Sequence, residues 1–361
     1  MTIAIDVSPL ESGHYLQHRV RGTGFYLQNL KTILPKYYPD NQYVFFNRGN
    51  KIENTDLVHY PYFEPFFLTL PVFSKNKRIV TVHDLTPLVF PSHFKVGLKG
   101  MLKWQIQKKA LQNTDAIITD SKSSKKDIVK FAGIKDSKVN VVYLAAGEQF
   151  KKNNDTRFAA RREGLMIKKI KEKYNLPEKF VLYVGDVTWN KNLPRLIEAV
   201  DKINVPLVMV GKALIDESID LDNPWNKDVV IIREKIKSNK KIICLGFVSN
   251  EELVALYNAA TVFAMPSLYE GFGLPILEAM SCGCPVVTSK EGSIPEITGE
   301  ATLSVDAYHV GSIAKGIKDV FDDKDLQATL SEEGIEQSKK FSWEKTAIET
   351  MSVYRKVTRK P

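Results

Sequence analysis

Two glutamates lie on either side of a glycine-rich turn in LYEGFGLPILEAMSCGCPVV, residues 268–287. Glycine lets the backbone approach a ligand closely, and Pro275 and Gly283 are typical of the start and the end of a helix. The pattern predicts a loop, a short helix, a second loop and a strand, with Glu270 before the helix and Glu278 inside it. Carboxylate oxygens accept hydrogen bonds strongly, so this stretch is suited to an oxygen-rich ligand.

The elements that must position these glutamates are short apolar runs with helical segments between them. They lie at 3–8, 43–47, 57–62, 78–84, 116–121 and 139–144, and again at 180–186, 206–212, 241–248, 261–267 and 285–289. Continuous apolar runs indicate parallel strands that are buried on both faces of a sheet, and such sheets bind ligands at the carboxyl ends of their strands. We expect two α/β domains that divide within the polar, basic segment 150–179.

Composition excludes several classes of protein. A chain of 361 residues with 43% hydrophobic and 26% charged residues is typical of a soluble globular protein. No apolar run is long enough for a membrane helix, the N-terminus lacks the pattern of a signal peptide, and Cys244, Cys282 and Cys284 have neither disulfide nor zinc spacing. Because no G-x-G-x-x-G follows the first strand, a dehydrogenase is disfavoured. We expect a cytoplasmic protein.

The formal net charge of +9 fits an anionic partner, which is a nucleic acid, an anionic substrate or an anionic membrane surface. The sequence lacks the strand aromatics of an RNA-binding domain, so nucleic acid is not expected. In the segment 90–111, Leu98, Leu102 and Ile106 have helical spacing, with lysines (Lys99, Lys103 and Lys109) elsewhere on the surface. This helix either packs on its own sheet or, together with the basic segment 157–173, docks on anionic lipid.

Residues 245–301 closely resemble the C-terminal domain of the family-four retaining glycosyltransferases, whose fold is GT-B. Two glutamates with seven residues between them, around Gly-Phe-Gly-Leu-Pro, are the best marker of that family. Supporting matches are RGTGFYLQNL (21–30), VTVHDLTPLVFP (80–91), DAIITDSKSSKKDI (115–128), LYVGDVTWNKNLPRLIEA (182–199) and FSWEKTA (341–347).

The resemblance implies an α/β protein with two Rossmann-like domains whose parallel sheets face each other across a cleft. Residues 1–165 would form the domain on the acceptor side, and residues 166–341 the domain that binds a nucleotide sugar. Residues 342–361 would form a helix that packs back toward the N-terminal domain.

The resemblance also assigns roles in the C-terminal domain. Glu278 would accept hydrogen bonds from the ribose, Glu270 would stabilise positive charge on the sugar, and Lys191 would neutralise the leaving diphosphate. Amides near the helix start would meet sugar hydroxyls and phosphate, namely those of Gly271, Phe272, Gly273 and Leu274. The alternatives are a helix-end charge for Glu278, a loop carboxylate for Glu270 and a solvated lysine for Lys191.

This sequence has Asp186 and Asn190 where many members of the family carry an arginine. Lys212 or Arg195 would then share the diphosphate charge with Lys191. The turn that contacts the base corresponds to Phe247 and Val248.

In the N-terminal domain, His83 matches a histidine that hydrogen-bonds the donor sugar, and the alternative is a structural pair with Asp84. Across the cleft, the diphosphate would meet the start of the first long helix, formed by Gly22, Thr23 and Gly24, with Arg21 adding charge. Ser121 is expected to cap the helix that follows it.

The resemblance implies transfer of a hexose-type sugar from a nucleoside diphosphate sugar, with retention of configuration. The acceptor would be a hydroxyl of a glycan or lipid-linked glycan in bacterial surface polysaccharide or glycoconjugate synthesis. Neither a metal nor a cofactor is expected, and the enzyme would be cytoplasmic or peripheral on the membrane. The alternatives are a GT-B enzyme with a soluble acceptor and a non-catalytic protein that binds nucleotide sugars.

Overall fold

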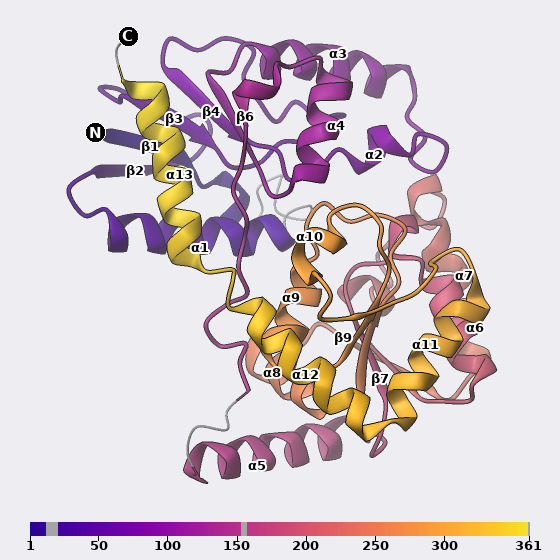
Figure 1. Ribbon diagram of the computed structural model, residues 1–361. Helices are drawn as coiled ribbons and strands as arrows, with labels where there is room; N and C mark the ends of the chain where they lie inside the picture. Colours follow the sequence, from indigo (N-terminus) through magenta and orange to yellow (C-terminus); the bar gives the residue numbers. More distant parts are fainter. Residues whose placement is uncertain (12–20, 153–156, 360–361) are drawn as a thin grey trace. The chain divides into compact units, whose positions relative to one another are not determined.

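The computed structural model describes residues 1–11, 21–152 and 157–359 and divides the chain into two α/β units (Figure 1). The first unit comprises Met1–Ala145 and Phe341–Pro361, and the second comprises Ala146–Lys340. The division comes earlier than the expected one between residues 165 and 166. The reason is that α5 (Arg157–Tyr174) packs on α8 (Asn250–Ala259) of the second unit, where Lys173 and Tyr174 donate hydrogen bonds to Glu252.

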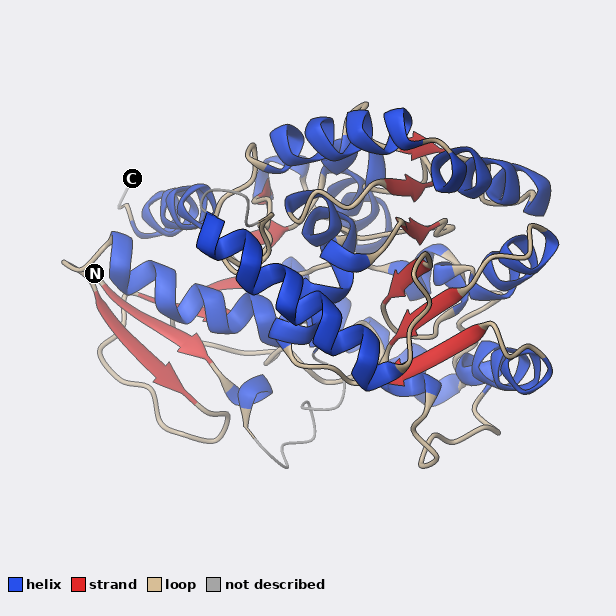
Figure 2. Ribbon diagram, turned by 90° about the horizontal axis from the view of Figure 1, so that it is seen from below, coloured by secondary structure: helices blue, strands red, loops and turns tan. Residues whose placement is uncertain are grey.

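The first unit contains a six-stranded parallel sheet with the order β2-β1-β3-β4-β5-β6. Each strand overlaps one of the predicted apolar runs: β1 (Thr2–Asp6), β2 (Gln42–Phe46), β3 (Leu57–Tyr60), β4 (Lys77–Thr81), β5 (Ala116–Thr119) and β6 (Val139–Val141). Strands β3 and β5 are buried along their whole length, and helices pack against the sheet (Figure 2). These helices are α1 (Arg21–Tyr37), α2 (Thr86–Val89), α3 (Leu98–Gln112), α4 (Lys122–Ala132) and α13 (Trp343–Thr358).

The C-terminal helix α13 packs beside α1 in the first unit (Figure 1). The hydroxyl of Tyr354, on α13, lies 2.7 Å from Nδ1 of His59, and Nε2 of His59 lies 2.8 Å from the Thr81 hydroxyl. Burial lowers the pKa of His59 to about 3, so this ring is neutral at physiological pH. The last helix of the chain is therefore joined to the core of the first sheet by a buried polar network.

The second unit contains another six-stranded parallel sheet, with the order β12-β11-β10-β7-β8-β9. Five strands fall within predicted runs: β7 (Val181–Val184), β8 (Leu207–Val210), β9 (Ile242–Gly246), β10 (Val262–Met265) and β11 (Val286–Thr288). The edge strand β12 (Leu303–Ser304) was not predicted, because two residues make no recognisable apolar run. Besides α5 and α8, the helices are α6 (Leu193–Lys202), α7 (Lys227–Ser238), α9 (Leu274–Ser281), α10 (Ile294–Thr298), α11 (Val310–Asp322) and α12 (Lys324–Ser338).

Only one end of α3 packs on the first sheet. Its buried residues are Gln107, Ala110 and Leu111, near the C-terminal end of the helix. Leu98 and Leu102, which were predicted to belong to an apolar stripe, are 86% and 64% exposed. Packing on its own sheet therefore accounts for the C-terminal half of α3 and leaves the N-terminal half uncovered in this structure.

Candidate active site

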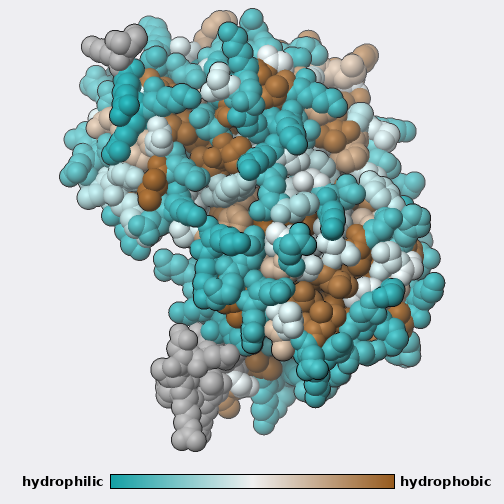
Figure 3. Space-filling view, in the orientation of Figure 1, coloured by the Kyte–Doolittle hydropathy of each residue, from teal (hydrophilic) through white to brown (hydrophobic). Residues whose placement is uncertain are grey.

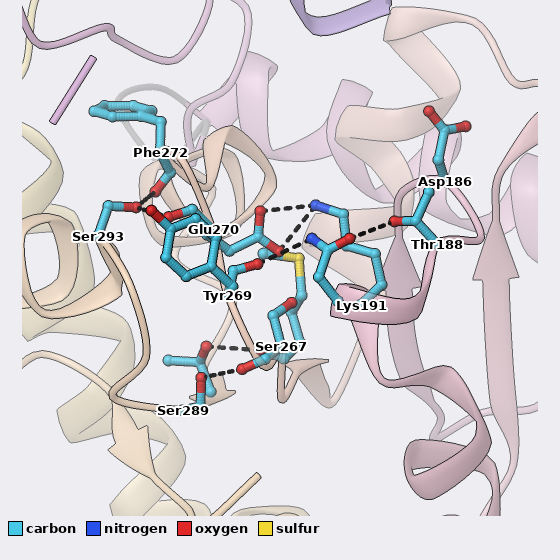
Figure 4. A network of polar contacts seen from close by, with 12 residues as sticks. Asp186, Thr188, Lys191, Ser267, Tyr269, Glu270, Phe272, Ser289 and Ser293 are labelled. Carbon is cyan, nitrogen blue, oxygen red and sulfur yellow. Dashed lines mark hydrogen bonds and ion pairs between the residues drawn. The ribbon is translucent and has the colours of Figure 1, made fainter. Parts of the chain in front are cut away.

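Lys191, which is partly buried, forms an ion pair with the buried Glu270 in the second unit (Figure 4). Lys191 lies in a short 3-10 turn after β7, and Glu270 lies in the loop after β10. These two strands are neighbours in the sheet, so their carboxyl ends bring the side chains together. The ammonium Nζ is 2.9 Å from Oε1 and 2.8 Å from Oε2 of Glu270. Lys191 was expected to meet the diphosphate and Glu270 the sugar, and in this structure they neutralise each other.

The loop that carries Glu270 is fixed by Asn190 and Ser293. The side-chain amide of Asn190 donates a hydrogen bond of 3.0 Å to the backbone carbonyl of Tyr269. The backbone carbonyl of Asn190 accepts one of 2.7 Å from the backbone amide of Leu268. The Ser293 hydroxyl lies 3.0 Å from the Glu270 carbonyl and 2.8 Å from the Phe272 carbonyl (Figure 4). Asn190, which stands where many members of the family have an arginine, thus holds the loop in place. Ser293 was not predicted, and no local signal in the sequence distinguishes it.

Gly292→Ala is expected to destabilise the protein and to reduce its activity, whereas Gly311→Ala is not. Gly292 has a φ of +62°, where alanine is strained, and a Cβ there would lie 2.6 Å from the Glu270 carbonyl oxygen and 2.8 Å from its amide nitrogen. The backbone of Glu270 would have to move. A Cβ at Gly311 would meet no atom within 4 Å. Urea unfolding and turnover of both variants check this, and equal behaviour of the two would contradict it.

Glu278 is buried in the middle of α9 and does not lie at the exposed end of this helix. It is the fifth residue of α9, 9% exposed, and its Oε2 accepts a hydrogen bond of 3.0 Å from the hydroxyl of Tyr257 on α8. Burial raises the pKa of Glu278 to about 8, and the Tyr257 hydrogen bond offsets part of that rise. A charge that complements the helix dipole acts within the first turn and at the surface, so this alternative does not account for Glu278.

The other predicted donor-side residues have distinct positions. Gly273 is the N-cap of α9, so Gly271, Phe272 and Gly273 precede the helix and Leu274 begins it. After β9, Phe247 is 80% exposed and Val248 is buried. The two cations considered as helpers of Lys191 have partners of their own: Lys212 lies 3.6 Å from Asp216, and Arg195 donates to Asn192 at 2.8 Å.

In the first unit, His83 is paired with Asp120 and not with Asp84. His83 follows β4, Asp120 follows the neighbouring β5, and Nδ1 of His83 lies 2.6 Å from Oδ2 of Asp120. Asp84 instead accepts from the amide of Thr86. Asp120 was not predicted as a site residue, although its place at the end of the strand next to β4 is the signal that could have found it. Ser121 caps α4 as predicted, accepting from the amide of Ser124.

Gly22, Thr23 and Gly24 form the first turn of α1. Thr23 is buried, whereas a Cβ at Gly22 or Gly24 would meet no atom within 4 Å. The side chain of Arg21 lies outside the described part of the structure. Within that described part, no three His, Cys, Asp or Glu side chains are grouped so that they could hold a metal ion, and Cys244, Cys282 and Cys284 are free.

Comparison with known proteins identifies the family. Residues 166–337 match Glycosyl transferases group 1, and residues 9–145 match Glycosyltransferase Family 4. The chain is 30% identical over 288 residues to the O-antigen chain mannosyltransferase B of Escherichia coli, covering 78% of this chain and 70% of that protein. It is 29% identical over 272 residues to the serotype-specific mannosyltransferase WbdA of the same species, covering 75% of this chain but only 32% of the length of WbdA.

A solved structure of Anabaena HepE in complex with UDP-glucose superposes with a TM-score of 0.70 at 18% identity, covering 98% of this chain and 99% of HepE. That likeness shows the GT-B fold, with its two Rossmann-like units. The expected α/β fold class is therefore confirmed. Because both family models match and the mannosyltransferase relative is 30% identical, the chain belongs to the group 1, family 4 glycosyltransferases.

Proposed function

We propose that this protein transfers a hexose from a nucleoside diphosphate sugar to an acceptor hydroxyl, with retention of configuration. The observation that carries the proposal is the Lys191–Glu270 ion pair in the same unit as Glu278. A cation and a carboxylate side by side suit the two charges that develop when a sugar–diphosphate bond breaks. Lys191 would meet the departing phosphate, and Glu270 would stabilise the positive charge at the anomeric carbon.

The bond between the anomeric carbon and the phosphate oxygen breaks, and the acceptor oxygen forms its bond on the same face of the sugar. The leaving phosphate takes the acceptor proton. Glu278 would hold the ribose hydroxyls, and His83 would contact the sugar near the reacting carbon. We also propose that Lys191 and the amides at the start of α9, rather than a divalent ion or a cofactor, balance the diphosphate charge.

The relatives support a hexose and a glycan acceptor. Two curated relatives are named as mannosyltransferases, one of them of the O-antigen chain, and HepE is seen with UDP-glucose. We propose that the acceptor is a glycan or lipid-linked glycan of bacterial surface polysaccharide synthesis.

The proposed function is tested with GDP-mannose, UDP-glucose and dTDP-sugars. A donor at 100 times its Kd should stabilise the native state by about 2.7 kcal/mol, which a thermal shift detects. The donor that gives this shift should release its nucleoside diphosphate faster when a glycan acceptor is added, and EDTA should not prevent this. NMR of the product should show the same anomeric configuration as in the donor.

Thermal stabilisation without turnover would favour the non-catalytic alternative. Loss of turnover in EDTA and its recovery with a divalent ion would contradict metal independence, and an inverted anomer would contradict retention.

A membrane surface is proposed as a further partner, through what we call the α3 patch, which comprises Leu68, Leu98, Lys99, Met101, Leu102 and Lys103. Its leucines and Met101 are all more than half exposed. Figure 3 shows apolar atoms among hydrophilic ones along the upper edge, where α3 runs. Nζ of Lys103 lies 5.4 Å from the centre of the Phe67 ring, which joins α3 to the loop that carries Leu68. Exposed apolar side chains between lysines fit the interface of an anionic bilayer.

The described part of the chain contains no helix that could cross a membrane. The basic segment 157–173 forms α5 in the second unit, and the side chains of Arg157, Arg161 and Arg162 lie outside the described part. The proposal therefore rests on the α3 patch.

The α3 patch is expected to bind anionic liposomes but not neutral ones. Each basic residue near an anionic bilayer contributes about 1 kcal/mol, which salt screens. Lys99→Glu with Lys103→Glu should abolish co-sedimentation at low salt, and Leu98→Ser with Leu102→Ser should weaken it. The matched control is Lys315→Glu with Lys318→Glu on α11, which makes the same charge change on other exposed lysines. Equal binding of the wild-type protein to anionic and neutral liposomes, or no binding to anionic liposomes at low salt, would contradict the proposal. Either result would favour a soluble acceptor.

A further inference from the structure

His83 and Asp120 form a buried pair with two polar atoms left unsatisfied. Nδ1 of His83 and Oδ2 of Asp120 are 2.6 Å apart. Nε2 of His83 and Oδ1 of Asp120 are buried and make no hydrogen bond of normal length and angle within the described part of the chain, although the Pro61 carbonyl lies near enough to the ring to favour its protonated form. Buried polar atoms in native proteins are nearly always hydrogen-bonded. These two atoms therefore mark a place where a ligand or solvent has to supply partners.

We propose that Asp120 is a positioning residue that holds His83 as a charged imidazolium, with Nδ1–H donated to the carboxylate and Nε2–H offered to the ligand. The proposal rests on the proposed function, because it takes His83 to contact the donor sugar. In a neutral ring whose Nδ1–H donates a hydrogen bond to Asp120, Nε2 carries only a lone pair and can only accept a hydrogen bond. The charged ring offers a donor instead, which suits a sugar hydroxyl oxygen or a phosphate oxygen.

The surroundings of His83 decide its charge. Burial by itself would lower the pKa of His83, but the charge and hydrogen bond of Asp120, the charge of Asp84 and the Pro61 carbonyl together raise it above the ordinary histidine value. Among the described residues, the other two groups beside the ring, Tyr26 and His59, are uncharged. The ring of Tyr26, on α1, packs against it edge to face, with the ring centres 5.1 Å apart. His59, on β3, is neutral, since burial first and His83 second lower its pKa.

The pair lies beside a buried polar network and a helix N-terminus. The hydroxyl of Tyr26 lies 3.1 Å from that of Thr81, which also contacts His59. Burial raises the pKa of Asp120, and the charge and hydrogen bond of His83 offset part of that rise. The positive end of α4, whose N-cap Ser121 directly follows Asp120, favours the ionised form. An ionised carboxylate at 2.6 Å is the partner that stabilises an imidazolium.

The titration of His83 in the full-length protein tests the proposal without any substrate. Long-range proton–nitrogen NMR resolves imidazole protonation, and the signal of His83, one of six histidines, is assigned with His83→Gln. In wild type, both ring nitrogens should be protonated at pH 7, with a pKa above that of free histidine. In Asp120→Asn, which keeps the shape and removes the charge, the pKa should fall by about one unit or more. Asp84→Asn, the matched control, removes a carboxylate that is not hydrogen-bonded to the ring and should lower the pKa less.

Kinetics provide the second readout. Relative to wild type, Asp120→Asn should lose turnover at pH 8 and recover much of it at pH 6, with KM for the donor little changed. A neutral His83 in wild type at pH 7, or the same His83 pKa in wild type and Asp120→Asn, would overturn the proposal. An equal loss of turnover at both pH values would also overturn it, since that is the behaviour of a structural role alone. A shifted titration without transfer from any donor would support the pair and overturn the proposed function.

Discussion

Glu270→Gln is expected to lower turnover by about 100-fold or more and to strengthen binding of the nucleoside diphosphate. A loss of this size is typical when one group that stabilises a transition state is removed. Nζ of Lys191 contacts both carboxylate oxygens of Glu270, and the two side chains are only 18% and 6% exposed. Neutralising Glu270 leaves a partly buried cation without its counter-charge, which is unfavourable. A diphosphate can then supply that charge with no competition from the carboxylate.

Lys191→Met should act in the opposite direction on binding while also lowering turnover. It leaves a buried, unpaired carboxylate in the place where the phosphate is expected, so the affinity for nucleoside diphosphate should fall. The affinity for the nucleoside without phosphate should change in neither variant. Lys212→Met is the matched control, because Lys212 is 62% exposed and its ion pair with Asp216 lies at the surface; it should have little effect.

Isothermal titration calorimetry of the three single variants and of the double variant Lys191→Met with Glu270→Gln decides between the alternatives. If the pair competes with the diphosphate, the two single changes shift its affinity in opposite directions, and their effects in the double variant are not additive. If both single variants weaken binding of the nucleoside diphosphate, Glu270 and the diphosphate do not compete for Lys191. Turnover that survives Glu270→Gln would remove Glu270 from the reaction.

Local sequence was sufficient for most of the fold. Eleven apolar runs each contain or overlap a strand. A strand that is buried on both faces, as β3, β5, β7, β8 and β10 are, is apolar along its length and is therefore easy to recognise. The cap at Ser121 follows from the hydroxyl type and the helix behind it. Glu270 and Glu278 were found for a similar reason, since two carboxylates around a glycine-rich turn are a local pattern. Their predicted roles as ligands of a nucleotide sugar stay predictions.

What the sequence alone did not provide is the pairing of residues from different strands. Lys191 meets Glu270 only because β7 and β10 are neighbours, and His83 meets Asp120 only because β4 and β5 are neighbours. In a parallel sheet, neighbours are set by how long crossover connections are laid down, and no short pattern encodes that order. The exposed end of α3 was left open for a related reason, since its leucine spacing fits both a packed helix and an uncovered one.

Glu278 should make the stability of the free protein fall as pH rises, and Glu278→Gln should remove that fall. Burial raises the pKa of Glu278 from 4.5 to about 8 in the native state. Between these values the unfolded carboxyl has lost its proton while the native one keeps it, so the native state binds more protons. Each pH unit in this window then costs about 1.4 kcal/mol of unfolding free energy. Glutamine keeps the shape and does not titrate.

The measurement is urea unfolding of wild type and Glu278→Gln at pH 5, 6, 7 and 8. The two should be closest at pH 5, and the glutamine variant should gain relative stability up to about pH 8 and level off above it. Tyr257→Phe removes the hydroxyl that favours the ionised carboxylate, so it should extend the window upward. Ribose hydroxyls also favour the ionised form. In wild type, the nucleotide should therefore bind more tightly at pH 8 than at pH 6, whereas in Glu278→Gln its affinity should be lower and nearly constant. Parallel unfolding curves at all four pH values would show that Glu278 is already ionised in the free protein, and its hydrogen bond with Tyr257 would then have to outweigh burial.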